Sequence, residues 1–173
     1  MGKARVVLAG AGKIGEAIVA LLSATGDYEV TVVEQDGERL RAFAREGLRT
    51  HACSLARPEE LVPVLAGQDA VVSACPYHLT PLVARAAREA GVHYFDLTED
   101  VESTRVVKRL AEGAHTAFVP QCGLAPGFIS IAAHEATRGF ESLRDVRLRV
   151  GALPLFPSNA LKYNLTWSTE GLI

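Results

Sequence analysis

Residues 5–15 read RVVLAGAGKIG, an apolar run that passes directly into three glycines with the spacing G-x-G-x-x-G. After its first residue the run has no polar alternation, as expected for a central parallel strand buried on both faces. Gly10 can turn tightly, Gly12 lets the backbone approach a pyrophosphate, and Gly15 lets the next helix pack closely on the strand. A helix beginning near Lys13 would offer free N–H groups and a partial positive charge to phosphates. This stretch therefore predicts a dinucleotide-binding α/β domain, although a glycine turn that binds nothing is the alternative.

Apolar runs alternate with helical patterns as far as residue 119, which is typical of parallel strands joined by crossover helices. Strands are predicted at residues 5–9, 29–34, 49–53, 70–74, 92–96 and 116–119. Helices are predicted from residue 13 onward and at 37–46, 59–66, 80–90 and 101–113. Six strands in this arrangement match the doubly wound Rossmann fold, with a parallel sheet in the order 3-2-1-4-5-6.

The pattern changes after residue 119. A helix is predicted at residues 127–137, and residues 143–150 alternate apolar with charged side chains like a half-exposed strand. We expect residues 1–122 to form the cofactor-binding domain. Residues 123–173 would then supply a crossover helix, a strand and the start of an incomplete second α/β domain.

Composition narrows the class of protein. The chain has 173 residues, of which 49% are hydrophobic, enough for one domain or one domain with a fragment of another. A net charge of −2 argues against nucleic acid as a partner, and no apolar run is long enough to cross a membrane. Neither the cysteines nor the histidines have the spacing of metal ligands, so no metal is predicted. We expect a cytoplasmic protein.

Glu34 ends the second predicted strand, 19 residues after Gly15. A carboxylate there can accept hydrogen bonds from the ribose hydroxyls of the adenosine and would repel a 2′-phosphate. Gln35 and Asp36 add no positive charge, and Arg39 is expected to be solvated on its helix. NAD is therefore predicted in preference to NADP, the alternative being that Glu34 is a solvated strand end.

The fourth predicted strand ends in SACPYH, residues 73–78, at the sheet edge where ligands of this fold bind. His78 could act as a general acid or base, or be merely exposed. Asp96 ends the next strand and could orient a substrate ammonium or cap the following helix. A loop at residues 120–127 could form one wall of a nicotinamide pocket. The predicted cofactor-binding residues are Gly10, Gly12, Lys13, Ile14, Gly15, Glu34, Gln35, Ser73, Ala74, Cys75, Pro76 and Gly123.

With these segments in view, the chain resembles the N-terminal NAD(P)-binding part of the saccharopine dehydrogenase family, which includes the lysine 6-dehydrogenases. The resemblance rests on four segments: GAGKIG at 10–15, SACPYH at 73–78, CGLAPGF at 122–128 and NALKYNLTWSTEGLI at 159–173. The resemblance implies a nicotinamide-dependent oxidoreductase acting at the C–N bond of a lysine-type amino acid. It also implies a second α/β domain that binds substrate and mediates dimerisation, hence a homodimer or self-association.

The chain departs from this family pattern at two positions. Asn164 follows Tyr163 where many relatives carry lysine, so a cationic role there is not carried over. Ser54 stands near the adenine side where relatives often have aspartate. Because an open cleft with one wall cannot hold a substrate carbon against the nicotinamide, we expect no appreciable turnover from this chain alone. A regulatory NAD-sensing module without turnover is the rival interpretation.

Overall fold

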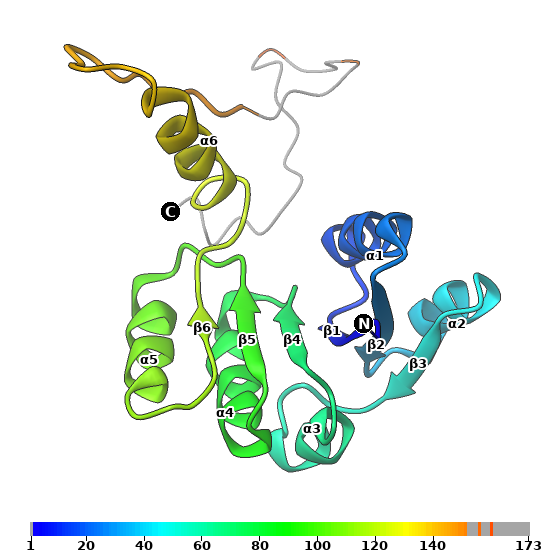
Figure 1. The fold of residues 1–173 in the computed structure, drawn as a ribbon. Helices are drawn as coiled ribbons and strands as arrows, with labels where there is room; N and C mark the ends of the chain where they lie inside the picture. The colour runs from blue at the N-terminus through cyan, green and yellow to red at the C-terminus, as the bar shows by residue number, and fades with distance from the viewer. Residues whose placement is uncertain (1, 152–155, 157–159, 161–173) are drawn as a thin grey trace.

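A six-stranded parallel sheet in the order β3-β2-β1-β4-β5-β6 forms the centre of the protein (Figure 1). This computed structural model describes residues 2–151, 156 and 160. The strands are β1 (Ala4–Ala9), β2 (Tyr28–Glu34), β3 (Arg49–Ala52), β4 (Ala70–Ser73), β5 (His93–Asp96) and β6 (Phe118–Val119). The helices are α1 (Lys13–Thr25), α2 (Gly37–Arg45), α3 (Pro58–Leu65), α4 (Thr80–Ala90), α5 (Val101–Ala111) and α6 (Phe128–Thr137), with a 3₁₀ turn, η1, at Tyr77–Leu79. The predicted α/β class and strand order are thus confirmed.

The sheet separates two hydrophobic clusters. Leu8 and Val32 lie in one cluster with Phe43 of α2 and Val19 of α1. Val7 lies in the other, among buried side chains of the helices α3, α4 and α5 on the opposite face (Figure 1). Because successive side chains of a strand point to opposite faces, a strand covered on both faces is apolar at every position. This is why the run at residues 6–9 shows no alternation.

Helix boundaries follow local chemistry, with two departures from the sequence prediction. Asp100 caps α5, and its side chain accepts a hydrogen bond from Ser103 N at 2.7 Å. The alternative that Asp96 caps this helix is therefore wrong. The 3₁₀ turn η1, which the sequence analysis does not predict, runs directly into α4, so Leu79 holds the N-cap position and Thr80 is the first residue of the helix. The Thr80 side chain is buried inside the fold.

The strand predicted at residues 143–150 is wrong. These residues are irregular and exposed, although α6 forms nearly where it was predicted. A strand needs a neighbour for its backbone N–H and C=O groups, and in the described part of the chain none pairs with this segment. The tail motif at 159–173, apart from residue 160, lies outside the described residues.

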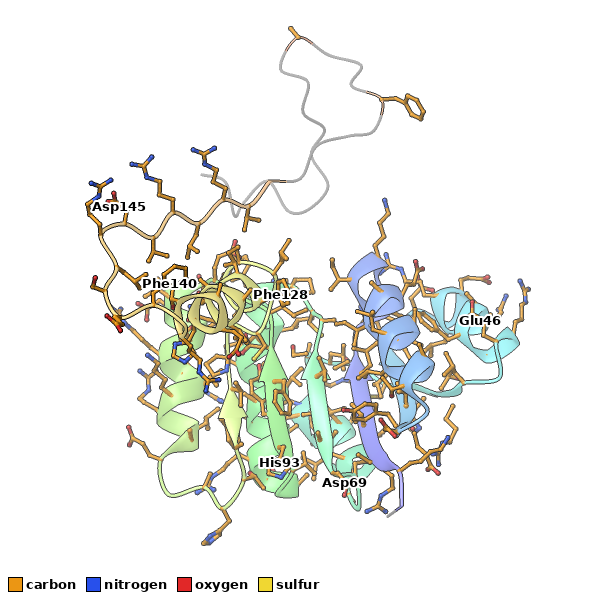
Figure 2. The ribbon with its side chains drawn as sticks, turned by 45° about the horizontal axis from the view of Figure 1, so that its top comes forward. Glu46, Asp69, His93, Phe128, Phe140 and Asp145 are labelled. Carbon is orange, nitrogen blue, oxygen red and sulfur yellow. The ribbon has the colours of Figure 1, made fainter. Side chains whose placement is uncertain are left out.

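Helix α6 lies beyond the carboxyl ends of β5 and β6 (Figures 1 and 2). Large apolar side chains on this helix are exposed. Phe128 is 62% exposed and Ile131 is 69% exposed. Phe128 lies at the edge of the molecule opposite to Asp69 and His93 (Figure 2). Within the described residues, no helix is both long enough and apolar enough to cross a bilayer.

Candidate functional site

Two of the three loop glycines are required by contacts inside the protein. Gly10 has a φ of 108°, and a Cβ atom there would lie 2.8 Å from the carbonyl oxygen of Ala74. A Cβ atom at Gly15 would lie 2.3 Å from the carbonyl oxygen of Gly10. Side chains at these positions would therefore force α1 away from the loop, or the loop away from β4.

Gly12 is different, because nothing inside the described part of the protein requires a glycine there. Its φ of −87° is accessible to every residue, and a Cβ atom would meet no described atom within 4 Å. Gly12 is also the N-cap of α1, whose first N–H groups receive no side-chain capping bond from the described residues. Free space and free N–H donors at one helix N-terminus are what a phosphate group fits.

The Glu34 carboxylate joins the glycine loop to the turn after β2. One oxygen accepts a hydrogen bond from Ala11 N at 3.2 Å, and the other accepts from Gln35 N at 2.9 Å and Asp36 N at 3.3 Å. The structure therefore brings Glu34 beside the glycine loop, as predicted, and holds its carboxylate in place. Sequence reasoning missed the bond to Ala11, since nothing in the residue pattern marks a contact across 23 positions.

The first positive charge after Glu34 in the chain is an arginine, which is paired with an acid. Arg39 of α2 points its guanidinium toward Asp36, with Nε 3.5 Å from the Asp36 carboxylate. Both side chains are largely exposed, so the pair contributes little to stability. Gln35 is exposed and uncharged. The arginine closest along the chain to Glu34 in α2 is thus paired with an acid.

The residues after β4 are hydrogen-bonded to the end of β1. Ala74 N donates to Ala9 O at 2.8 Å, and the Cys75 thiol donates to the same oxygen at 3.1 Å. Burial raises the pKa of the Cys75 thiol to about 12, so the thiol stays protonated and has a packing role. Ser73 is buried, and its hydroxyl lies beside the Cys75 thiol and the Tyr94 hydroxyl without a well-formed hydrogen bond among the described residues. The predicted cofactor contact of Ser73 finds no support in this position.

The other predicted residues of this edge are accessible. Lys13 and Ile14 are exposed in the first turn of α1, and Pro76 is exposed before η1. His78 is exposed within η1, where its ring meets the ring of Tyr77 edge-on at a centroid distance of 5.8 Å. Such a histidine is free to contact a ligand, and its catalytic role remains a prediction.

Asp96 is fully buried, with an exposed fraction of 0%. One carboxylate oxygen accepts from Tyr94 O–H at 2.9 Å, and the other accepts from Thr98 N at 3.0 Å and Gln121 N at 3.1 Å. Both oxygens are therefore occupied by internal donors. A fully buried carboxylate held in this way does not reach a substrate, so the geometry gives no support to the predicted catalytic contact of Asp96.

The loop after β6 is tightly folded where it meets α6. A Cβ atom at Gly123 would lie 3.3 Å from Leu97 O, and Gly127, with a φ of 127°, lies directly against Gly123. Phe128 N donates to Gly123 O at 2.8 Å and so starts the helix. The loop thus lies against the residue that follows Asp96, next to the carboxyl end of β5.

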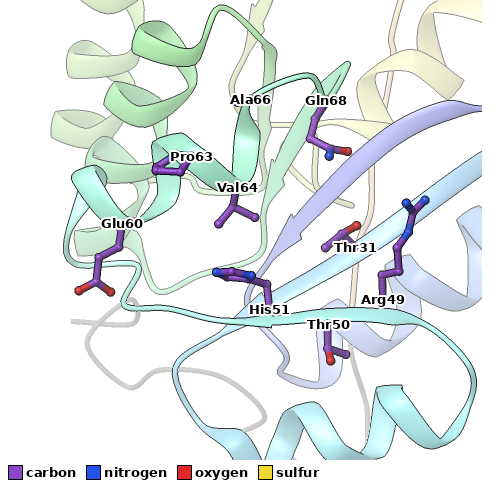
Figure 3. Close-up of a pocket in the computed structure, with 9 residues that line it drawn as sticks. All are labelled: Thr31, Arg49, Thr50, His51, Glu60, Pro63, Val64, Ala66 and Gln68. Atoms are coloured by element: carbon purple, nitrogen blue, oxygen red, sulfur yellow. The ribbon is translucent and has the colours of Figure 1, made fainter.

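Two surface grooves lie away from the glycine loop. One, of about 510 Å³, is bordered by β3 and α3, and Figure 3 shows His51, Val64 and Gln68 around it. The other, of about 400 Å³, lies between α1 and α2. Neither is lined by a residue of the carboxyl edge described above, where the candidate site forms an open edge of the domain.

Comparisons with known proteins agree with this geometry. A family model described as the saccharopine dehydrogenase NADP binding domain matches residues 6–118. Saccharopine dehydrogenase (NADP(+), L-glutamate-forming) of Saccharomyces cerevisiae is 26% identical over 180 residues, which cover 100% of this chain and 40% of the yeast protein. Mitochondrial alpha-aminoadipic semialdehyde synthase of Bos taurus is 24% identical over 182 residues, which cover 99% of this chain and 19% of the bovine protein.

The comparison with solved structures agrees on the fold. The structure of apo saccharopine dehydrogenase (L-Glu forming) from Saccharomyces cerevisiae aligns with a TM-score of 0.73 and 23% identity, covering 98% of this chain and 40% of that one. The chain thus spans less than half the length of these relatives. The comparisons give no support to the regulatory alternative. Because the family model covers most of the sheet and the glycine loop, we conclude that the chain belongs to the saccharopine dehydrogenase NADP-binding domain family.

Proposed function

We propose that this chain is the NAD-binding part of an oxidoreductase that acts at the C–N bond of a lysine-type amino acid. The proposal that the chain binds a dinucleotide rests on the open space at Gly12 beside the uncapped N-terminus of α1. The proposed substrate rests on the family resemblance of the sequence and on two relatives, which are named as an L-glutamate-forming saccharopine dehydrogenase and an alpha-aminoadipic semialdehyde synthase. When bound, the nicotinamide supplies the acceptor of a hydride from the substrate carbon.

The residues present fit such a cofactor. The main-chain N–H groups of Lys13 and Ile14 would bind the pyrophosphate above Gly12, where no side chain intervenes. Glu34 would accept hydrogen bonds from the adenosine ribose, and its position is already fixed by Ala11 N. Ala74 would lie beneath the second ribose, next to Gly10.

NAD is proposed over NADP although the matching family model and the yeast relative are both named for NADP. This preference is supported by Glu34, whose carboxylate is fixed beside the glycine loop and would meet a 2′-phosphate there, and by Arg39, which is paired with Asp36. A phosphate dianion beside a fixed carboxylate would reduce the binding free energy of NADP by about 1 to 3 kcal/mol, the scale of one charge-assisted hydrogen bond. This corresponds to a preference for NAD of roughly 5- to 150-fold.

Calorimetric titration with NAD and with NADP tests this proposal. Glu34→Gln is the matched variant, because it keeps the size and hydrogen-bonding oxygen of the side chain and removes the charge. We expect this variant to lose most of the discrimination. Equal affinities of the unaltered chain for both cofactors, or tighter binding of NADP, would overturn the assignment of Glu34.

The remaining parts of the proposal concern substrate and assembly. A small amino acid would bind at the open edge near His78, the candidate proton acceptor. Copies of the chain would associate in the cytoplasm through the exposed apolar side chains of α6, which include Phe128 and Ile131.

Hydride transfer needs the reacting atoms held about 3 to 3.5 Å apart. The open edge supplies one wall for this, so we expect cofactor binding without appreciable oxidation of lysine or saccharopine by the 173 residues. Rapid formation of reduced cofactor by a monomer would contradict this expectation.

A further inference from the structure

One buried carboxylate ties together two loops at the carboxyl edge of the sheet. Asp96 accepts hydrogen bonds from Thr98 N in the loop after β5 and from Gln121 N in the loop after β6. Its main-chain carbonyl also accepts from Cys122 N at 2.7 Å. Two consecutive N–H groups of the second loop are therefore bound by a single residue.

The loop after β6 depends on these hydrogen bonds because its backbone is strained at Gln121. Gln121 has a φ of 63°, the one positive φ at a non-glycine residue in the described part of the chain. Such a conformation is sparsely populated and persists only where surrounding contacts enforce it. The bond from Gln121 N to Asp96 is one of those contacts, and the full burial of Asp96 protects it from competition by water.

The loop lies on the side of the site that the nicotinamide would occupy. Glu34 at the end of β2 and the glycine loop after β1 would hold the adenosine and pyrophosphate, so the rest of a dinucleotide would extend the opposite way, over β4 and β5. Neighbouring strands are about 4.8 Å apart, so this direction leads toward the end of β5. Gly123, which follows the strained turn, lies against Leu97 there.

We propose that Asp96 is a positioning residue, whose carboxylate holds the loop at 120–123 as a wall for the nicotinamide end of the cofactor. This inference rests on the proposed function, because it assumes that a nicotinamide dinucleotide is the ligand. It assigns Asp96 no contact with the ligand and no transfer of a proton.

Titration with NAD and with ADP-ribose, which lacks the nicotinamide, tests the inference. The unaltered chain should bind NAD more tightly than ADP-ribose. Asp96→Ala should weaken NAD binding about five- to tenfold, the scale of one lost hydrogen bond, and leave ADP-ribose binding within about twofold. Asp96→Asn should retain NAD binding within about twofold, because its amide oxygen can still accept from Thr98 N and Gln121 N.

Tyr94→Phe is the stability control. It removes the donor to the other Asp96 oxygen and leaves that oxygen buried without a partner, so the melting temperature should fall. The bonds to the two loops remain, so the ratio of NAD to ADP-ribose affinity should not change. If Asp96→Ala does not fold, Asp96→Ser replaces it, since a serine hydroxyl is too short to accept from both loops.

The outcomes separate the two proposals. Equal weakening of both ligands by Asp96→Ala, unchanged binding of both, or equal affinities of the unaltered chain for NAD and ADP-ribose would overturn the positioning role while leaving cofactor binding intact. Failure of the unaltered chain to bind either ligand would overturn the proposed function, and the positioning role with it.

Discussion

Gly12 and Gly15 offer a direct test of which glycine serves the ligand and which serves the fold. At Gly15 an added methyl group would lie 2.3 Å from the Gly10 carbonyl oxygen, a backbone atom that cannot rotate away. Overpacking of this kind costs about 1 to 3 kcal/mol, which for a chain of this size lowers the melting temperature by roughly 2 to 12 °C. Gly15→Ala should therefore be a stability variant.

Gly12→Ala should behave in the opposite way. The methyl group would enter space that no described atom occupies within 4 Å, at an ordinary φ of −87°. The gain from restricting the unfolded chain and the loss of a favourable N-cap residue nearly offset each other, so stability should change by less than about 1 kcal/mol. The methyl group would, however, stand where a pyrophosphate approaches the backbone. Losing a charge-assisted hydrogen bond there weakens binding roughly 10- to 150-fold, and Gly12→Val should abolish it.

The assay pairs thermal unfolding followed by circular dichroism with calorimetric titration of NAD. Measured together, the two variants should show a loss of affinity without a loss of stability at position 12, and a loss of stability at position 15. If Gly12→Ala binds NAD as well as the unaltered chain, the space at Gly12 is not the pyrophosphate site. If Gly12→Ala is as unstable as Gly15→Ala, the open space inferred from the structure does not exist.

Two further predictions concern pH and assembly. Burial raises the pKa of Cys75 from 9.0 to about 12, so unfolding releases its proton above pH 9. The free energy of unfolding should fall as the pH rises from 9 toward 12, by at most about 1.4 kcal/mol per pH unit from this group, and urea titrations of Cys75→Ala should show a flatter decline. In the second prediction, Ile131→Asp on α6 should lower the mass measured by light scattering toward that of a monomer. Leu21→Asp, at a similarly exposed apolar position on α1, is its control, and an equal effect of both variants would refute a specific α6 interface.

The sheet could be predicted from the sequence because its central strands are buried on both faces and therefore continuously apolar, as at residues 6–9. The glycine loop and Glu34 were predictable because fixed spacing within one strand–helix–strand unit determines where they meet. Residues 143–150 were mispredicted because alternation indicates a strand only where a neighbouring strand is present to pair with it. The burial of Asp96 and Ser73 depends on how the loops after β4, β5 and β6 fold over one another, which no local pattern encodes.

The two-sided pairing of β1 also bears on how the domain forms during synthesis. One partner, β2, is complete about 25 residues after β1, which is the length of an ordinary crossover. The other partner, β4, begins only at Ala70, and just before it Asp69 accepts a hydrogen bond from Arg5 N across 64 positions. Until the ribosome has released that segment and the helix after it, the face of β1 carrying Val7 has α3 but not α4 to cover it. Gly10 likewise has no Ala74 to lie against. A nascent chain arrested before β4 would therefore present an unpaired apolar strand edge, a species that aggregates or recruits chaperones, and added dinucleotide could not rescue it.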